Sequence, residues 1–255
     1  MPIALLTDFG TSDYYVGAVK GVILSINPTA NVIDITHEIE PQDVASAAFI
    51  LRACYQDFPV GTVFLCVVDP GVGSDRRAII VETDRYYFVG PDNGLFSFVL
   101  SETAAVHVIE NRRYFRPLVS STFHGRDIFA PVAAHLSKGV EFQEFGPRID
   151  DAIVLADSEP RQIDEKTIEG RVIHIDRFGN LVTNIPDSIA ERFSKIEIAG
   201  TSITELRRTY ADSRSDQAFA VVGSAGLIEI SVNRGSAAIV LSASMGTKVI
   251  LQYVI

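Results

Sequence analysis

The sequence contains no tryptophan, and only two cysteines and two methionines in 255 residues. Cys54 falls in an apolar, helix-like stretch and Cys66 in a strand-like one, so they do not form the spaced pairs that disulfide frameworks and metal motifs require. This sparing use of cysteine excludes a disulfide-rich scaffold and is typical of a reducing compartment.

Basic residues are also scarce. The 22 Lys and Arg residues are outnumbered by 32 Asp and Glu, which gives a formal net charge of -10. Nucleic-acid binding relies on many clustered Lys and Arg contacts with phosphates, so this charge disfavours a nucleic-acid partner. No apolar run approaches the roughly 18 residues that a transmembrane helix needs, and the N-terminus carries no basic signal-peptide region. We therefore expect a cytoplasmic protein that does not enter a membrane.

Apolar residues are plentiful: 47% of the chain is hydrophobic, enough for a sizeable core in one large domain or two smaller ones. Through about the first 140 residues, strand-like and helix-like segments alternate, which is the pattern of an α/β domain. The fold class expected for residues 1–160 is an N-terminal α/β domain with a largely parallel central sheet. We predict helices at 14–26 with Asp13 as N-cap, at 44–54 and at 128–137 with a stop at Gly139, and strands at 31–35, 63–68, 78–82, 86–89 and 105–109.

Helix-like segments nearly vanish after a polar, Pro-containing stretch at 141–166, which has the composition of an inter-domain connection. The pattern beyond it predicts a smaller C-terminal all-β domain at 167–255, built as a barrel or sandwich. Its expected strands are short and separated by turn residues, at 172–175, 181–184, 196–198, 218–222, 227–232, 237–241 and 248–254.

A polar cluster follows one of the buried-looking strands of the first domain. Asp69 comes directly after the run 63–68 and would lie at the carboxyl edge of a parallel sheet, where open α/β folds place their ligands. The glycines that follow permit a sharp turn, so Arg76 and His124 are candidates to meet Asp69 in one pocket. The alternatives are an exposed Asp–Arg pair of little significance and a structural histidine.

Two further segments have the residue types of a nucleoside site. Asp8, at the end of the first strand-like run, is placed to accept both hydroxyls of a ribose, although a turn or helix-capping Asp also fits. In the second domain, Phe178 offers a stacking face and Asn180 a donor and acceptor pair suited to a base edge. Gly179 between them also fits a simple turn.

Seven short segments, in order over nearly the whole chain, carry a family resemblance: TDFG at residues 7–10, DITH at 34–37, DPGVG at 69–73, GPDNG at 90–94, TFHGRD at 122–127, IDRFGN at 175–180 and NRGSAA at 233–238. Together they resemble the S-adenosyl-L-methionine hydroxide adenosyltransferases, which are relatives of the fluorinase and chlorinase enzymes. A match of this length and order is far more specific than any single motif.

The resemblance implies hydrolysis of S-adenosyl-L-methionine (SAM) to adenosine and L-methionine, by attack of a water-derived hydroxide on the 5′ carbon of the ribose. It carries the family's catalytic triad onto Asp69, Arg76 and His124, with no metal and no cofactor, and leaves open whether His124 is a base or a positioner. Fluorinase-like members lack this triad and carry an extra loop in the first domain that this sequence does not have, so halide-dependent adenosyl transfer is the disfavoured alternative. The resemblance also implies a homotrimer, in which the first domain of one subunit meets the second domain of its neighbour and the active sites are intersubunit.

The resemblance also implies substrate contacts. Asp8 would hold the ribose hydroxyls and Asn180 the adenine. Phe123 and Phe178 would flank the adenosyl group, and Asp176 would bind the methionine ammonium. Further candidates for the amino-acid moiety are Ser224, Glu229, Asn233 and Arg234. The backbone at Ser236 and Ala237 is a further candidate for contacting adenine. Because strand faces alternate, Glu229 fits a solvent-facing position equally well.

Two other function classes stay open. Carboxylate and histidine side chains bind divalent ions, so a metal-dependent phosphohydrolase could use Asp8, Asp13, Asp92, Asn93, His124 and Asp127. No short ligand motif such as His-x-x-x-His supports such a site, and sensitivity of the activity to a chelator would identify it. The other class is a non-catalytic adenosine-binding or SAM-binding protein, which the intact triad disfavours.

Overall fold

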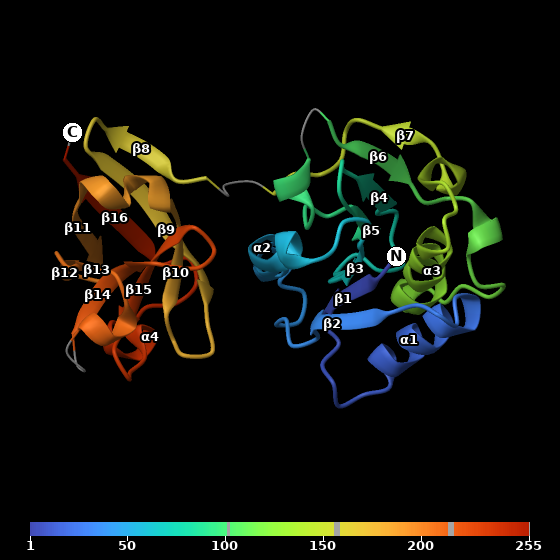
Figure 1. The fold of residues 1–255 in the computed structure, drawn as a ribbon, viewed down its shortest axis with the longest axis horizontal. Helices are drawn as coiled ribbons and strands as arrows, with labels where there is room; N and C mark the ends of the chain where they lie inside the picture. Colours follow the sequence, from blue (N-terminus) through green and yellow to red (C-terminus); the bar gives the residue numbers. More distant parts are fainter. Residues whose placement is uncertain (101–102, 156–158, 214–216, 255) are drawn as a thin grey trace. The chain divides into compact units, whose positions relative to one another are not determined.

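The computed structural model describes residues 1–100, 103–155, 159–213 and 217–254. The chain forms two compact units, Met1–Leu155 and Ala156–Ile255 (Figure 1). The first unit has apolar clusters on both faces of its sheet, and the second unit has a cluster of its own. No helix in the described ranges is long and apolar enough to cross a membrane.

A seven-stranded sheet in the order β2-β1-β3-β5-β4-β6-β7 forms the centre of the first unit. The strands β2, β1, β3 and β5 pair in parallel, whereas β4, β6 and β7 are added by antiparallel pairing. The α/β prediction is confirmed, but the sheet is partly rather than largely parallel, because a short turn joins β4 to β5 and forces them to run in opposite directions. The strands are β1 (Ile3–Thr7), β2 (Val32–Thr36), β3 (Val63–Val67), β4 (Ala78–Glu82), β5 (Tyr87–Pro91), β6 (Ala105–Val108) and β7 (Arg148–Ile149).

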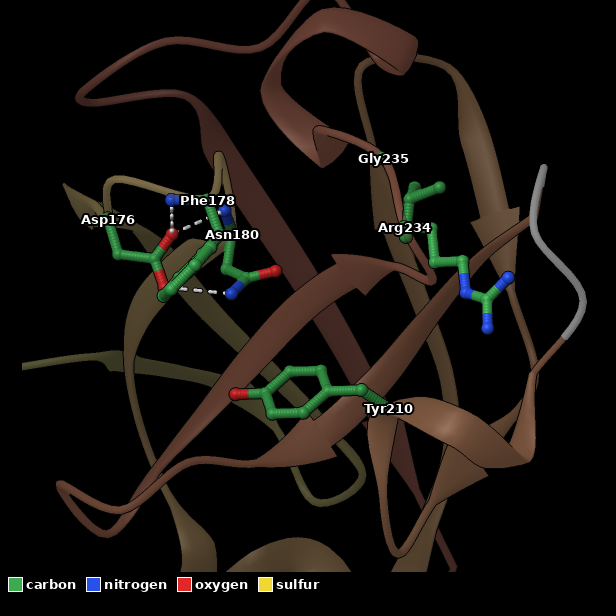
Figure 2. Close-up of a pocket in the computed structure, with 7 residues that line it drawn as sticks. Asp176, Phe178, Asn180, Tyr210, Arg234 and Gly235 are labelled. Atoms are coloured by element: carbon green, nitrogen blue, oxygen red, sulfur yellow. Dashed lines mark hydrogen bonds between the residues drawn. The ribbon is translucent and has the colours of Figure 1, made fainter.

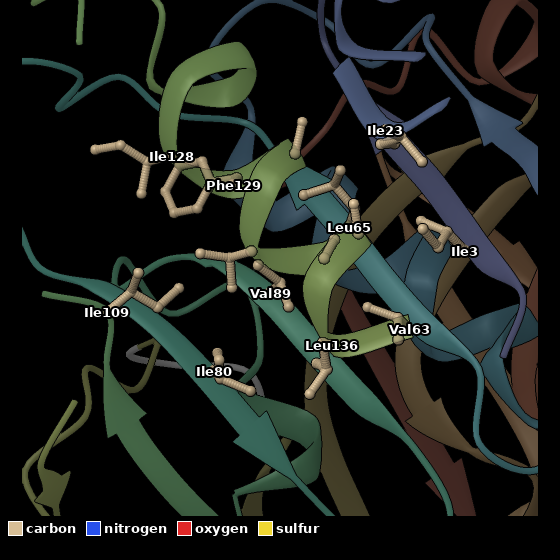
Figure 3. Close-up of a cluster of buried hydrophobic side chains, with 14 of the residues drawn as sticks. Ile3, Ile23, Val63, Leu65, Ile80, Val89, Ile109, Ile128, Phe129 and Leu136 are labelled. Carbon is tan, nitrogen blue, oxygen red and sulfur yellow. The ribbon is translucent and has the colours of Figure 1, made fainter. Parts of the chain in front are cut away.

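Helices cover both faces of this sheet, because successive side chains of a strand point to opposite sides. Ile3 and Leu5 of β1 belong to the cluster formed with α1 (Tyr15–Ile26) and α3 (Ala130–Ser137), and Figure 3 shows Ile3 in that cluster. Ala4 and Leu6 belong to the cluster formed with α2 (Val44–Cys54). β1 is therefore buried along its whole length, and its end holds the following residues in a fixed place.

Two helix starts differ from the prediction. α1 begins after Tyr14 and has no side-chain cap, so the predicted capping role of Asp13 is wrong. The helix expected at 128–137 is α3, and a π-helical turn, η4 (Gly125–Phe129), precedes it directly after His124. Such turns often occur at functional sites. The other short helical turns of this unit are η1 (Tyr55–Asp57), η2 (Ser97–Val99), η3 (Arg112–Tyr114) and η5 (Phe142–Phe145).

The second unit is a nine-stranded sheet in the order β12-β11-β16-β9-β10-β15-β14-β13, with β8 paired to β9. The sheet curls into a half-barrel around an apolar core, as expected for a small all-β domain. Its strands are β8 (Arg161–Asp164), β9 (Thr167–Ile175), β10 (Leu181–Pro186), β11 (Phe193–Ile198), β12 (Thr201–Ile203), β13 (Leu206–Arg207), β14 (Ala218–Val222), β15 (Leu227–Val232) and β16 (Lys248–Tyr253), and its helical turns are η6 (Asp187–Arg192) and η7 (Tyr210–Asp212).

One predicted strand of this unit is wrong. The segment predicted as a strand at 237–241 forms the short helix α4 (Ala237–Val240), which Ser236 caps by accepting a hydrogen bond from the Ile239 N–H. An apolar run this short has no periodicity that separates a strand from a helical turn. The polar stretch 141–166 contributes η5 and β7 to the first unit and β8 to the second, and its residues 156–158 lie outside the described ranges.

Candidate active site

The turn that follows β3 carries Asp69 and Arg76. It packs against the segment before His124 so closely that a Cβ atom on Gly73 would lie 2.2 Å from the Ser121 carbonyl oxygen. Gly73 also has φ +78°, a backbone conformation that side chains disfavour. Glycine at this position therefore allows two segments distant in the sequence to meet.

The three residues predicted to meet do so. Arg76 Nε donates to Asp69 Oδ1 at 2.8 Å, and Arg76 Nη2 donates to Asp69 Oδ2, which makes the pair bidentate. The same Nη2 lies 3.0 Å from His124 Nδ1. The guanidinium also lies over the Phe129 ring, 5.1 Å from its centre. The side chains of Arg76 and Asp69 are only 11% and 5% exposed, so the alternative of an exposed, insignificant pair is wrong.

The hydrogen-bond pattern assigns the form of the imidazole. A guanidinium has donors only, so His124 Nδ1 accepts from Arg76 and a neutral ring carries its proton on Nε2. Burial lowers the pKa of His124 and the positive charge of Arg76 lowers it further, while the negative charges of Asp69 and Asp127 oppose them. At neutral pH, His124 therefore offers an Nε2–H donor.

Asp8 lies at the same edge of the sheet as Asp69. It follows β1, which pairs in parallel with β3, so the two carboxylates leave neighbouring strand ends. Asp8 Oδ2 accepts from the backbone N–H of Gln42 at 2.9 Å. Burial raises the pKa of Asp8, the hydrogen bond from Gln42 opposes the rise, and the charge of Asp69 adds to it. Both carboxylates thus lie at the carboxyl edge of the parallel strands, which is where Asp69 was expected.

Asp8, Asp69 and His124 line one cavity of about 380 Å³. Aromatic rings form part of its wall: Phe123 packs edge-on against Phe9, with 5.9 Å between the ring centres, and against Tyr15 at 5.2 Å. Phe9, Tyr15 and Gln42 also line this cavity and were not among the predicted site residues. Phe9 lies inside the TDFG segment and could have been found there, whereas nothing in the sequence marks Gln42.

The second unit has its own polar turn, between β9 and β10. Asp176 Oδ1 accepts from the backbone N–H groups of Phe178 and Asn180, each at 2.9 Å, and Asp176 Oδ2 accepts from Asn180 Nδ2 at 2.8 Å (Figure 2). Gly179 has φ +81°, and a Cβ atom there would lie 2.0 Å from Ser236 Oγ. The segment is a turn, as the simpler interpretation predicted, and it leaves the Phe178 ring 77% exposed.

This turn forms one wall of a cavity of about 610 Å³. Tyr210 and Arg234 lie across it (Figure 2). In that view the Arg234 guanidinium is directed away from Asp176 and Asn180. Sequence reasoning missed Tyr210, because it belongs to a short helical turn outside every conspicuous motif.

Glu229 supports Tyr210. Its side chain lies inside the second unit with the residue only 8% exposed, so the solvent-facing alternative is wrong. Glu229 Oε2 accepts from the Tyr210 hydroxyl at 3.0 Å. Burial raises the pKa of Glu229, and burial together with the Glu229 charge raises the pKa of Tyr210 to about 12. Tyr210 is therefore a protonated donor at neutral pH.

The other predicted contacts of the second unit are not among the residues that line this cavity. Ser224 is exposed in the turn between β14 and β15. Asn233 Nδ2 donates to the Ser213 carbonyl at 2.8 Å. Ser236 caps α4, and Ala237 is fully buried. Asn233, Ser236 and Ala237 thus have structural partners or are buried, and Ser236 also packs against the turn that carries Asn180.

The residues suggested as metal ligands do not assemble. Asp92 is paired with Arg77 at 2.6 Å, and Asp127 with Arg126 at 2.7 Å. The Asn93 amide donates to the Val68 carbonyl. Across the ranges that the structure describes, no group of three or more His, Cys, Asp or Glu side chains is placed to hold a metal ion. The donor set of the phosphohydrolase alternative is therefore scattered.

Comparisons with known proteins show which family the chain resembles over most of its length. Residues 3–146 match the SAM hydroxide adenosyltransferase N-terminal domain, and residues 170–250 match its C-terminal domain. The chain is 39% identical to an (R)-S-adenosyl-L-methionine hydrolase of Thermus thermophilus (92% of this chain, 93% of the relative) and 30% identical to a fluorinase of an Actinoplanes species (72% and 71%). A crystal structure of a conserved protein from Thermotoga maritima superposes with a TM-score of 0.91 at 40% identity, covering 98% of this chain and 99% of that one. The chain belongs to the SAM hydroxide adenosyltransferase family.

Proposed function

We propose that the protein hydrolyses SAM to adenosine and L-methionine, with Asp69, Arg76 and His124 acting on the nucleophile. The observation that supports this most is the contact of Arg76 with both Asp69 and His124 at a cavity that also contains Asp8. The Thermus thermophilus relative is an (R)-S-adenosyl-L-methionine hydrolase, and the same reaction accounts for the groups present here.

The reaction needs no general acid. A hydroxide oxygen forms a bond with C5′ of the ribose while the bond from C5′ to sulfur breaks. The electron pair of the breaking bond goes to sulfur. The sulfonium thus leaves as a neutral thioether. The proton lost when water becomes hydroxide goes to solvent. The protein must hold the nucleophile in line with the breaking bond and stabilise its charge before attack.

His124 acts as a positioner rather than a base. Its Nδ1 lone pair is used by Arg76, and its Nε2 carries a proton, so the neutral ring donates a hydrogen bond to the attacking oxygen. Arg76 adds a positive charge next to that donor. Asp69 holds the guanidinium in place through two hydrogen bonds and balances its charge.

We assign the substrate contacts to residues that line the two cavities. Asp8 holds the ribose hydroxyls, and Phe123 and Phe178 flank the adenosyl group. Asn180 donates to Asp176 through Nδ2, so its Oδ1 is oriented to accept from the adenine amino group. Asp176 carries the negative charge for the methionine ammonium. Because Asp8 and Asn180 belong to different units, we also propose the homotrimer that the family resemblance implies.

Incubation of the purified protein with SAM, followed by chromatographic separation, tests this function. We expect adenosine and methionine in equal amounts, and the same rate with EDTA, because the reaction uses no metal. The Arg76→Ala variant is the matched control for contaminating activity. Appearance of 5′-methylthioadenosine or S-adenosylhomocysteine would contradict the proposal, and binding of SAM without turnover would favour a non-catalytic binding protein.

The 30% identity to a fluorinase gives a second reaction to test in the same assay. Fluoride or chloride is added to parallel incubations, and the products are searched for a 5′-halogenated adenosine. We expect none, because the site has the triad of Asp69, Arg76 and His124 that we assign to hydroxide. A halide-dependent product would assign adenosyl transfer to halide instead.

A further inference from the structure

The DITH segment at 34–37 has no part in the mechanism above, yet its histidine is buried beside the site. His37 is 5% exposed and Thr7 is 2% exposed. Thr7 Oγ1 lies 2.8 Å from His37 Nδ1. Thr7 is the last residue of β1, and Asp8 follows it directly. The contact thus joins two buried polar side chains, one of which immediately precedes Asp8 of the cavity in the sequence.

The groups around His37 assign a direction to this contact. His37 Nε2 lies 3.1 Å from Asp34 Oδ1, although the contact is not a regular hydrogen bond. A carboxylate attracts an N–H, which favours the proton on Nε2 and leaves Nδ1 as the acceptor. The Thr7 hydroxyl then donates to Nδ1 and accepts from the Phe9 N–H at 3.3 Å. Lys20 Nζ lies 2.6 Å from the other oxygen of Asp34 and fixes the carboxylate.

The same two segments are joined on both sides of Asp8. The Gly10 N–H donates to the His37 carbonyl at 2.8 Å. Further along, the Gln42 N–H donates to the Asp8 carboxylate at 2.9 Å. Gln42 has φ +71°, an unfavourable conformation for a residue with a side chain, so the surrounding structure must hold it there. Asp8 is thus oriented by the 37–42 segment, and His37 anchors that segment to the end of β1.

We propose that His37 and Thr7 are positioning residues for Asp8, setting the direction of its carboxylate for a ribose diol. Neither residue lines the cavity. Their contact fixes the end of β1 relative to the turn that bears Gln42. This inference rests on the proposed function of Asp8 in holding the ribose.

Calorimetric titration with two nucleosides tests the inference. Adenosine has the 2′ and 3′ hydroxyls, whereas 2′,3′-dideoxyadenosine lacks both, so the ratio of their affinities measures the contact with the diol. Thr7→Val keeps the shape of the side chain and removes the hydroxyl, whereas Thr7→Ser keeps the hydroxyl. We expect Thr7→Val to lower the ratio about tenfold with the affinity for dideoxyadenosine unchanged, and Thr7→Ser to keep the ratio.

A second pair of variants approaches the contact from the other side. His37→Asn keeps an acceptor near the position of Nδ1, and His37→Ala removes it. We expect His37→Ala to behave as Thr7→Val does and His37→Asn to preserve the ratio. Near-ultraviolet circular dichroism establishes that each variant is folded, and this second pair decides the question if Thr7→Val does not fold.

Three outcomes are distinguishable. If the wild-type protein binds both nucleosides equally, Asp8 does not hold a diol and the proposed function of that residue fails first. If the wild type discriminates but the folded Thr7→Val and His37→Ala variants keep the full ratio, the positioning role is overturned. Equal loss of affinity for both nucleosides would likewise overturn it, because that is the result of a general structural role.

Discussion

Nη2 of Arg76 lies 3.0 Å from Nδ1 of His124, and this contact determines which form of the imidazole the site can hold. A protonated imidazole has a hydrogen on both nitrogens and cannot accept from a guanidinium. It would also place two positive charges side by side. Protonation of His124 would therefore break the contact that joins it to Arg76.

Acid should inactivate the protein through His124, but only below the usual range for histidine. Burial and the charge of Arg76 lower the pKa of His124, so the neutral form persists below the ordinary value of about 6.5. We expect turnover to be retained at that pH and to fall at lower pH. Nuclear magnetic resonance titration of the imidazole signals, together with a pH–rate profile, measures both effects.

The Arg76→Ala variant separates the two causes of the lowered pKa. Removing the positive charge should raise the pKa of His124 relative to the wild type, while burial remains. His135 is an internal control, because its pKa is lowered by burial and by Lys138 and Arg113 rather than by Arg76. A wild-type His124 that titrates above the ordinary value, or one unaffected by Arg76→Ala, would contradict the assigned form.

Variants of the triad and of Asp8 should fail differently. Arg76→Ala and His124→Ala should reduce turnover and leave adenosine binding largely intact. Asp8→Ala should weaken adenosine binding by about 2 kcal/mol, the scale of charged hydrogen bonds to the diol. Calorimetry with adenosine beside turnover assays measures both quantities. Asp13→Ala is a suitable control, because Asp13 is exposed and caps no helix.

The division of roles would be wrong if Asp8→Ala bound adenosine normally while His124→Ala did not. Loss of both binding and turnover in all three variants would instead indicate that the cavity had collapsed. Circular dichroism of each variant identifies that case.

The sequence could predict this site where chain direction alone determines proximity. Asp8 and Asp69 follow two apolar runs. Parallel pairing of such runs places their carboxyl ends at the same edge of the sheet, whatever the conformation of the connecting loops. Arg76 is close to Asp69 in the sequence. The position of His124 could not be derived in that way, because it depends on a turn that packs on Ser121 and on a π-helical turn with no periodic signal.

The residues that were missed or misplaced depend on tertiary packing. Gln42 contributes a backbone N–H, which any residue type has, so its identity carries no signal. Tyr210 reaches the cavity because buried Glu229 accepts from its hydroxyl. Ala237–Val240 forms a helix because Ser236 caps it and the Gly179 turn packs there, and four apolar residues alone do not specify this.

Gly73→Ala should be destabilising and should impair turnover. The new methyl group would lie 2.2 Å from the Ser121 carbonyl at φ +78°, and strain of this kind costs on the order of 1–3 kcal/mol. The turn must move to relieve it, which separates Asp69 and Arg76 from His124. Urea denaturation and turnover assays measure the two effects.

Gly17→Ala is the matched control for that variant. Gly17 lies in α1, where an added Cβ meets no atom within 4 Å. Alanine in a helix is favoured over glycine by about 0.5–1 kcal/mol, so this variant should be as stable as the wild type or more so, with unchanged turnover. Equal behaviour of the two alanine variants would show that the close approach at Gly73 is unimportant.

Subunit mixing tests the proposed trimer. If each site combines the first unit of one subunit with the second unit of its neighbour, Asp69→Ala and Asn180→Ala subunits can restore each other. Each mixed trimer can then form sites in which both contributing units are intact, and random exchange at equal amounts should make about a quarter of all sites wild-type.

A mixture of Asp69→Ala with Arg76→Ala is the control, because both changes lie in the first unit and no combination restores a site. Turnover assays after exchange measure the recovered activity. Mass spectrometry of the intact assembly measures the subunit composition of the trimers. Recovery in the first mixture and none in the control is expected, whereas verified exchange without recovery would mean that each chain builds its site alone.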